Sequence, residues 1–339
     1  MEKRKMLIAV DADGGDYAPR EIVKGAAEAA EEYKLDIALV GRKTVLDMLV
    51  RRYGKKQKMA IIETSQTIEC SENPLQAIRS KPDSSIVVGT KLVKNCEVSA
   101  FVSAGNTGAM LTSAYLNLER VEGIKRPALC GIIHITNKPV FLIDVGANVD
   151  CQPDFLLQFG YMGATFAKGF LEVDEPRVGL LNNGEEEIKG NTLTKKTYQL
   201  LKKARLNFVG NIEGQEILND KADVIVCDGF IGNIVLKTME GFGHIFQSIL
   251  GVGQSYKIDT QLQGSALVHY VDLTSLVKRM DYKEYGGACL LGVNGNIIVA
   301  HGRSHSKAIK NAIHLAHRTV ETGITESIRN GQNGINSSI

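Results

Sequence analysis

Short apolar runs along the chain break repeatedly into clusters of glycine, amide and carboxylate residues. Five runs show this pattern, and at least four of the clusters lead into a stretch with helical spacing; the clusters begin at Gly14, Ser103, Asp144, Asn182 and Asp228. Continuous Val, Ile and Leu runs are typical of parallel strands that are buried on both faces of a sheet. Ligands of such sheets bind outside the carboxyl ends of the strands, so we expect the clusters to line one crevice.

The same periodicity predicts alternating strands and helices along most of the chain. Predicted strands cover 6–11, 36–40, 59–63, 100–102, 178–181, 207–209, 224–227, 286–292 and 295–302. Predicted helices cover 18–33, 43–53, 73–79, 84–94, 107–118, 153–170, 192–204 and 306–322. Two runs, 129–135 and 140–143, are joined by a short polar link, which predicts an antiparallel hairpin in an otherwise parallel sheet.

This pattern predicts one α/β domain over residues 1–325. A helix-like segment over about 243–282 interrupts the strand rhythm and predicts a helical protrusion. Residues 326–339 are rich in Ser, Asn and Gly, so we expect a frayed, flexible tail there.

Composition narrows the class of protein. Of 339 residues, 44% are hydrophobic and 23% are charged, which is ordinary for a soluble globular protein. The net charge of +2 and the absence of Trp argue against a nucleic-acid partner. The six cysteines include no CxxC pair, so zinc-ligand spacing is missing. We see no secretory h-region and no apolar run of about 18 residues, so we expect a cytoplasmic protein.

Two glycine-containing turns are candidate anion sites. The first lacks the GxGxxG spacing of a dinucleotide fold and fits a tight turn equally well. The second opens a predicted helix, whose free N–H groups attract anions; alternatively, Asn106 or Thr107 simply caps that helix. The candidates are Gly14, Gly15 and Asp16 in the first turn, and Gly105, Asn106, Thr107 and Gly108 in the second.

The stretch 182–191 carries the most candidate chemistry. It places Glu185, Glu186, Glu187 and Lys189 between two glycines, directly after a predicted core strand. Lys189 could neutralise a phosphate as a point charge, and the acids could order it. The alternative is a solvated run of surface charges.

Two further clusters supply amides and carboxylates. The first contains Asn148 and Asp150; a metal site is conceivable there, but hard cations usually gather more carboxylates. We expect Asp150 to cap the helix that begins at Pro153. In the second, Asn233 leads into an apolar helix and could donate to an oxyanion or cap that helix. His301 and Arg303 are weaker candidates, and no GxSxG elbow supports a serine-hydrolase triad.

Nine strings, in order along the chain, resemble the phosphate acyltransferases of bacterial phospholipid synthesis, the acyl-carrier-protein:phosphate transacylases. They are VDADGGDYAP (10–19), DSSI (83–86), SAGNTGA (103–109), GANVDCQPDFL (146–156), LLNNGEEEIKGN (180–191), NFVGNIEG (207–214), CDGFIGN (227–233), EYGGACLLGVNG (284–295) and HGRS (301–304). Two positions depart from the family pattern: Asp13 stands where the family usually has Met, and Tyr17 where it usually has His. An added carboxylate beside the glycines would repel an anion.

The resemblance implies a three-layer α/β/α, Rossmann-like fold related to isocitrate and isopropylmalate dehydrogenases, in a homodimer without a cofactor or metal. It implies reversible transfer of a long-chain acyl group from acyl carrier protein to inorganic phosphate. The acyl phosphate would pass to a membrane-bound glycerol-3-phosphate acyltransferase, with the enzyme peripherally associated with the membrane surface.

The resemblance also suggests roles for the candidate residues. Lys189 would be the cation for phosphate or carbonyl, Asn233 an oxyanion donor, and Glu185 and Glu186 would order Lys189. The second glycine turn would form the anion cradle. Further substrate-binding or crevice residues would be Gly14, Gly15, Asp16, Asn148, Asp150, Asn182 and Asp228.

Two surfaces and three other functions stay open. A basic helix could dock the acidic carrier protein or be an ordinary solvated face; its residues are Lys195, Lys196, Lys202, Lys203 and Arg205. Segment 243–282 could lie on a membrane or pack in the dimer interface. The competing functions are a coenzyme A-dependent phosphotransacetylase, a metal- and nicotinamide-dependent dehydrogenase of the same fold, and a membrane-surface scaffold.

Overall fold

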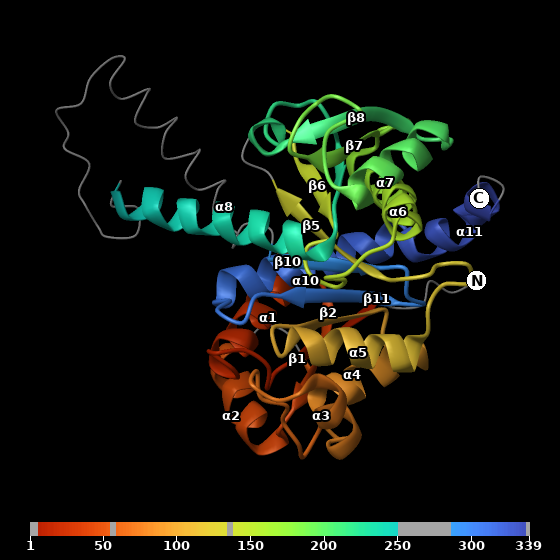
Figure 1. The fold of residues 1–339 in the computed structure, drawn as a ribbon. Helices are drawn as coiled ribbons and strands as arrows, with labels where there is room; N and C mark the ends of the chain where they lie inside the picture. The colour runs from red at the N-terminus through yellow and green to blue at the C-terminus, as the bar shows by residue number, and fades with distance from the viewer. Residues whose placement is uncertain (1–5, 55–58, 134–137, 250–285, 337–339) are drawn as a thin grey trace.

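One mixed β-sheet runs through the whole molecule. The computed structural model describes residues 6–54, 59–133, 138–249 and 286–336. Its strands form an 11-stranded sheet in the order β3-β2-β1-β4-β11-β10-β5-β6-β9-β7-β8 (Figure 1). The strands are β1 (Leu7–Asp11), β2 (Asp36–Gly41), β3 (Ala60–Glu63), β4 (Ala100–Ser103), β5 (Ala128–Ile133), β6 (Val140–Ile143), β7 (Arg177–Asn182), β8 (Asn207–Glu213), β9 (Val224–Val226), β10 (Gly287–Leu291) and β11 (Asn296–Ala300).

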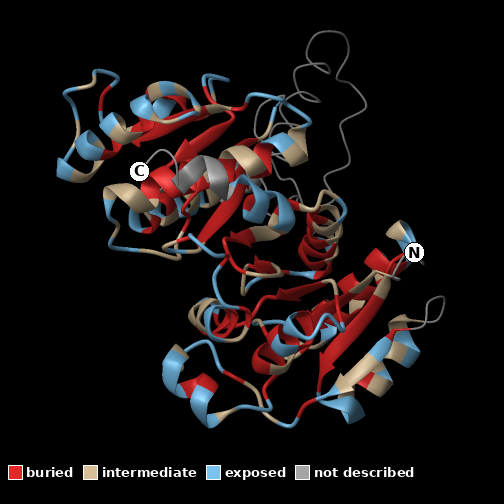
Figure 2. Cartoon of the chain, turned by 90° about the vertical axis from the view of Figure 1, so that its right-hand side faces the viewer, coloured by how far each residue is buried: buried red, intermediate tan, exposed pale blue. Residues whose placement is uncertain are grey.

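Helices cover both faces of this sheet. Ile8 and Val10 of β1 belong to one buried cluster and Ala9 to the other, as the alternation of a strand requires. The first face is covered by α1 (Arg20–Tyr33), α2 (Lys43–Tyr53), α6 (Pro153–Leu171), α7 (Thr192–Lys203), α10 (Ser306–Glu321) and α11 (Ile324–Asn336). The second face is covered by α3 (Pro74–Ser80), α4 (Ser85–Lys94), α5 (Thr107–Leu118) and α8 (Gly229–Ile249). The predicted three-layer α/β/α class is confirmed, with the sheet as the buried layer in Figure 2.

The predicted antiparallel hairpin is also confirmed, and it has a consequence that the sequence pattern did not indicate. β5 pairs antiparallel with β6, and β10 pairs antiparallel with both β5 and β11. β1, β4 and β11 therefore run one way, while β6, β7 and β9 run the other. We expected the five polar clusters to line one crevice, but the strands that they follow end at opposite ends of the sheet.

Several element boundaries differ from those predicted. α8 already begins at Gly229, ahead of Asn233, and β8 continues to Glu213. Of the predicted protrusion, residues 243–249 belong to α8, whereas 250–282 lie outside the described residues. Within the described part of the chain, no helix combines the length and the apolarity needed to cross a bilayer.

The prediction of a frayed tail from residue 326 is wrong for residues 326–336, which belong to α11. Ile324 and Ile328, four residues apart, are 1% and 3% exposed and join the core cluster that also contains residues of α6. Residues at this spacing share one helix face, so two isoleucines suffice to dock the helix despite its polar composition.

Replacing Ile328 with Ala should lower the free energy of unfolding by about 2–5 kcal/mol, because the change removes buried methyl groups and leaves a cavity. Urea unfolding measures this quantity. The control Glu326→Ala, at an exposed position of the same helix, should stay within about 0.5 kcal/mol of wild type. A similarly small effect of Ile328→Ala would restore the interpretation of a frayed tail.

Candidate active site

A buried carboxylate joins the ends of β1 and β4. Asp11 is 1% exposed, and its Oδ2 accepts a hydrogen bond of 2.6 Å from Ser103 Oγ. Ser103 Oγ in turn accepts from the backbone N–H of Gly105 at 3.0 Å. Burial raises the pKa of Asp11, and the hydrogen bond from Ser103 opposes that shift. Asp11 therefore fixes the start of the second glycine turn.

The first glycine turn packs directly against this pair. A Cβ on Gly14 would lie 2.8 Å from Gly105 N and would collide with Asp11 Oδ2. Gly15 has a φ of +108°, a conformation that L side chains rarely adopt. Asp16 is exposed, and its N–H donates to the carbonyl oxygen of Gly302 at 2.8 Å. The geometry is that of a tight turn that joins β1 to the loop after β11.

Asn106 acts as a structural cap. Its Oδ1 accepts from Ala109 N at 2.9 Å, which confirms the capping interpretation. Its Nδ2 donates to carbonyl oxygens of the loop 69–72 at 3.1–3.2 Å. A Cβ on Gly108 would lie 2.6 Å from Pro74 Cγ. An anion at this helix end would therefore have to use backbone N–H groups, since the Asn106 side chain is occupied.

The two departures from the family pattern have partners of their own. Asp13 is turned toward the end of β2, where its Oδ1 lies 3.4 Å from Nε of Arg42. Tyr17 stacks on His305 with ring centroids 4.1 Å apart. The Arg42 cation offsets the added carboxylate, which weakens the repulsion that the sequence predicts.

Asp144 organises the polar turn that follows β6, residues 144–148. The side chain is fully buried, and its two oxygens accept five N–H bonds of 2.7–3.1 Å. Burial raises the pKa of Asp144, and these donors oppose the shift. The donors are the backbone N–H groups of Leu129, Gly146, Ala147 and Asn148 and the side-chain amide of Asn148.

Asn148 and Asp150 of this turn have different surroundings. Asn148 Nδ2 also donates to Pro127 O at 2.7 Å, and Asn148 O accepts from Gly229 N at 2.8 Å, which ties the turn to the start of α8. Asp150 is exposed. The prediction that Asp150 caps α6 is wrong, because the N-cap is Gln152 and makes no side-chain cap hydrogen bond.

Asn233 lies in the second turn of α8, beside the Asp144 turn. A Cβ on Gly146, which has a φ of +139°, would lie 2.7 Å from Asn233 Nδ2. Asp228 caps α8 by accepting from Ile231 N at 2.8 Å, so Asn233 is not the cap. Among the described residues we find no hydrogen-bond partner for the half-buried Asn233 amide. Its N–H groups are therefore available to a substrate oxygen.

The ammonium group of Lys189 is also available to a substrate. The residue is exposed, and its stem folds over Gly184, where a Cβ would lie 2.7 Å from Lys189 Cγ. No acidic partner of its ammonium occurs in the described ranges. The prediction that Glu185 orders Lys189 is wrong: Glu185 pairs with Lys221 at 2.6 Å. Glu186 contributes its carbonyl oxygen, which accepts from Lys189 N at 3.0 Å.

A cavity of about 330 Å³ joins the Lys189 loop to the start of α8. Gly190 has a φ of +95°, and a Cβ there would lie 2.5 Å from Asn182 Oδ1, so the loop closes tightly over the end of β7. The cavity has polar and apolar lining residues, which are Asn182, Asn183, Gly190, Asn191, Thr194, Asp228, Leu156, Leu180, Leu181, Cys227 and Ile231.

α8 connects the Asp144 turn with the loop after β11, which lies beside the glycine turns that follow β1 and β4. Glu240 Oε2 lies 4.0 Å from Nε2 of His301, in the loop after β11. Glu240 follows Asn233 by seven residues, so both side chains lie on one helix face about 10 Å apart. Burial raises the pKa of Glu240, and Lys237 opposes the shift. The polar residues predicted to line one crevice thus form two groups, and α8 bridges them. The contact between Glu240 and His301 was not predicted from the sequence.

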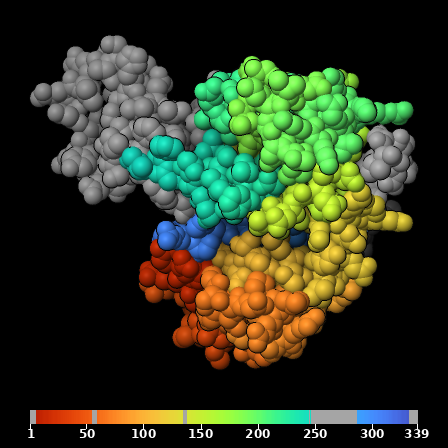
Figure 3. Space-filling view, in the orientation of Figure 1, coloured from red at the N-terminus to blue at the C-terminus, as the bar shows by residue number. Residues whose placement is uncertain are grey.

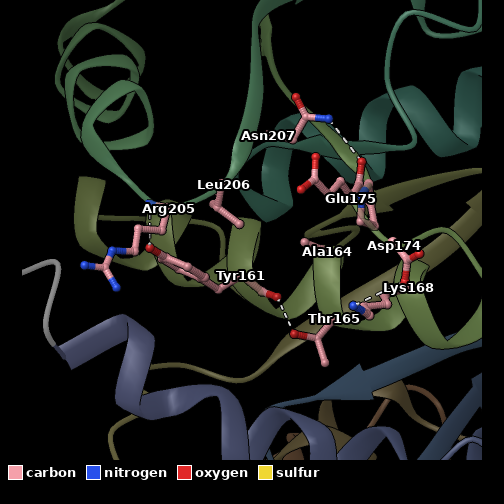
Figure 4. A pocket seen from close by; sticks show the side chains of 10 residues that line it. Tyr161, Ala164, Thr165, Lys168, Asp174, Glu175, Arg205, Leu206 and Asn207 are labelled. Carbon is pink, nitrogen blue, oxygen red and sulfur yellow. Dashed lines mark hydrogen bonds and ion pairs between the residues drawn. The ribbon is translucent and has the colours of Figure 1, made fainter.

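The predicted carrier-docking helix is only partly available. Lys195, Lys196 and Lys203 are exposed, but Lys202 pairs with Glu187 at 2.7 Å. Arg205 lines a separate cavity of about 470 Å³, between α6 and the start of β8 (Figure 4). There Lys168 and Asp174 pair at 3.6 Å. Two of the five predicted docking cations therefore have other contacts, and carrier docking on this helix stays a prediction.

The described thiols near the site are poor nucleophiles. Burial raises the pKa of Cys151 to about 12 and that of Cys227 well above its usual value. A thiol is a nucleophile only as its thiolate, so neither supports a covalent mechanism. In the part of the chain that the structure describes, no three His, Cys, Asp or Glu side chains gather as a metal site.

Sequence comparisons identify close relatives along nearly the whole chain. A family model described as "Fatty acid synthesis protein" matches residues 6–327. A phosphate acyltransferase from Dehalococcoides mccartyi is 54% identical over 327 residues, covering 95% of this chain and 93% of the relative. A phosphate acyltransferase from Pelotomaculum thermopropionicum is 49% identical over 328 residues, covering 96% and 94%.

Solved structures with much lower identity share the fold. A phosphotransacetylase from Streptococcus pyogenes matches with a TM-score of 0.62 at 16% identity, covering 94% of this chain and 95% of the other. A branched-chain phosphotransacylase from Enterococcus faecalis matches with a TM-score of 0.54 at 12% identity, covering 93% and 99%. The chain belongs to the phosphate acyltransferase family and is an acyltransferase that transfers an acyl group to phosphate in fatty acid and phospholipid synthesis.

Proposed function

We propose that the protein reversibly transfers a long-chain acyl group from the thioester of acyl carrier protein to inorganic phosphate, in the cavity between the Lys189 loop and α8. The observation that carries this proposal is a pair of available groups on the two elements that flank the cavity, the Lys189 ammonium on its loop and the Asn233 amide on α8. Lys189 directly precedes Gly190 of the lining, and Asn233 follows Ile231. A cation and a neutral donor are what an anionic nucleophile and a developing oxyanion require.

In this proposal phosphate binds in the cavity beside the loop 182–191, held by Lys189 and by N–H groups at the start of α7. A phosphate oxygen attacks the thioester carbonyl, and Asn233 donates to the resulting oxyanion. The carbon–sulfur bond then breaks, its electron pair leaves with sulfur, and the phosphate proton ends on the thiol. Holding both reactants in place supplies the catalysis, and no enzyme nucleophile takes part.

The proposal also covers the partners. Acyl carrier protein supplies the acyl group, and a membrane-bound glycerol-3-phosphate acyltransferase consumes the acyl phosphate. The protein would act in the cytoplasm without a cofactor. A coenzyme A-dependent reaction is the alternative, because the fold is shared with phosphotransacetylases. Peripheral membrane contact through 243–282 stays a prediction, since residues 250–282 lie outside the described residues.

An exposed apolar face on α8 supports the proposed homodimer. Phe230, Ile234, Phe242 and Ile245 are 54%, 48%, 53% and 54% exposed. Their spacing places them along one side of the helix, which crosses the front of the molecule between its two halves in Figure 3. An exposed apolar stripe of this length marks an interaction surface, and we propose that the α8 faces of two chains pack together.

Replacing Lys189 with Ala should lower the phosphate-dependent release of carrier-protein thiol by about 100-fold or more, because a charge-stabilising contact is lost. Thiol release from palmitoyl-carrier protein, with and without phosphate, measures this. Lys91→Ala, at an exposed lysine of α4, is the control and should keep wild-type turnover. Near-wild-type turnover of the Lys189 variant at saturating phosphate would remove Lys189 from the mechanism. If the same acyl group is transferred only from coenzyme A, the carrier-protein assignment fails.

Replacing Phe242 and Ile245 together with Asp should convert the dimer to monomers, because two charges would have to be buried in an apolar interface. Sedimentation velocity measures the oligomeric state. Leu116→Asp, at a 51% exposed leucine of α5, is the matched control and should remain dimeric. A dimer that tolerates both charges on α8 would place the interface elsewhere, and a monomeric wild type would rule out the homodimer.

A further inference from the structure

Another cavity lies between the Asp144 turn and α5. Its volume is about 230 Å³, and residues 147 and 148 of the turn form one wall. The opposite wall is the face of α5 that carries Leu111, Thr112 and Tyr115, and Arg126 and Pro127 also line it. The neighbouring residue Gly146 abuts the Asn233 amide. The Asp144 turn therefore contacts both this cavity, through residues 147 and 148, and the group that we assign to the oxyanion, through Gly146.

The size and lining of the cavity fit a slender arm. At about 230 Å³ the cavity is smaller than a typical pocket for a drug-sized ligand, so it would hold only part of a long arm. Leu111 and Pro127 offer apolar contacts. Thr112 Oγ1 donates to Gly108 O at 2.7 Å and keeps lone pairs that can accept from an amide N–H.

Two arginines stand beside the cavity. Arg126 is exposed, and its guanidinium lies over the ring of Phe155 at 5.8 Å. Arg120 lies over the ring of Tyr115 at 5.6 Å and donates to Lys125 O at 2.7 Å. Neither guanidinium has a carboxylate partner in the described ranges. A guanidinium held over an aromatic ring and free of a counter-ion is well suited to bind carboxylate or phosphate oxygens.

The basic helix α7 is less suited to the same task. Lys202 is neutralised by Glu187, and Arg205 faces the cavity of Figure 4. The remaining lysines of α7, Lys195, Lys196 and Lys203, are exposed.

We propose that the cavity between α5 and the Asp144 turn receives the pantetheine-type arm of an acidic carrier protein, and that Arg126 and Arg120 bind the acidic surface or phosphodiester at the base of that arm. This inference rests on the proposed function and names the site where its carrier substrate docks. Charge complementarity at the mouth favours a partner with an acidic surface.

Charge reversal tests the docking surface. Arg126→Glu should raise the KM for palmitoyl-carrier protein about tenfold or more, and much less for S-palmitoyl pantetheine, which lacks the acidic protein. The matched control Lys196→Glu, on α7, should change the KM for the carrier less than twofold. An unchanged carrier KM for Arg126→Glu, or a larger increase for Lys196→Glu, would overturn the proposal. Wild-type protein that releases no thiol from either substrate would instead overturn the proposed function.

Disulfide trapping tests the cavity without an activity readout. Cys70 and Cys96 are exposed and are first replaced with Ser. Thr112→Cys in this background should then form a mixed disulfide with holo-carrier protein whose arm thiol is activated, and none with apo-carrier protein. Lys196→Cys is the matched surface control and should trap at least tenfold more slowly. Equal trapping at the two positions would overturn the placement of the arm, and a Thr112 variant that fails to unfold cooperatively is replaced by Leu111→Cys.

Discussion

The hydrogen bonds to the Asp144 carboxylate are the interaction on which the rest of the site depends. Five N–H groups converge on a fully buried side chain at the end of β6. Removing one partner of such a charged hydrogen bond costs about 1.5–3 kcal/mol, so the five together hold residues 144–148 in one conformation. That conformation turns Asn148 O toward Gly229 N and brings Gly146 against Asn233. The carboxylate is best understood as a positioning group for the oxyanion donor.

The direction of the strands constrains how the site is assembled. Because the sheet reverses between β11 and β6, the glycine turns near Asp11 and the amide-rich turn near Asp144 lie at opposite strand ends. α8 spans this separation, from the Asp144 turn to His301. Asn233 and Glu240 then lie on one helix face, about 10 Å apart. A substrate that lies along α8 would touch both halves of the molecule.

Local signals in the sequence predicted local structure well. The helices Lys43–Tyr53 and Thr107–Leu118 have the predicted bounds, because periodicity and capping are written in neighbouring residues. The reversal of the sheet depends on long-range pairing, which periodicity does not encode. The Glu185–Lys221 ion pair was missed because its partners are 36 residues apart. The tail from residue 326 was predicted to be frayed because it is rich in Ser, Asn and Gly. The spacing of Ile324 and Ile328, which indicates a buried helix face, was the more informative signal.

The central claim is that phosphate binds beside Lys189, at the cavity between the Lys189 loop and α8. A crystal structure of the protein soaked with phosphate tests it most directly. The account predicts a bound phosphate with an oxygen about 2.7–3.2 Å from Lys189 Nζ, next to Asn182 and the start of α7. A phosphate bound at Gly14 and Gly15, with none beside Lys189, would contradict it.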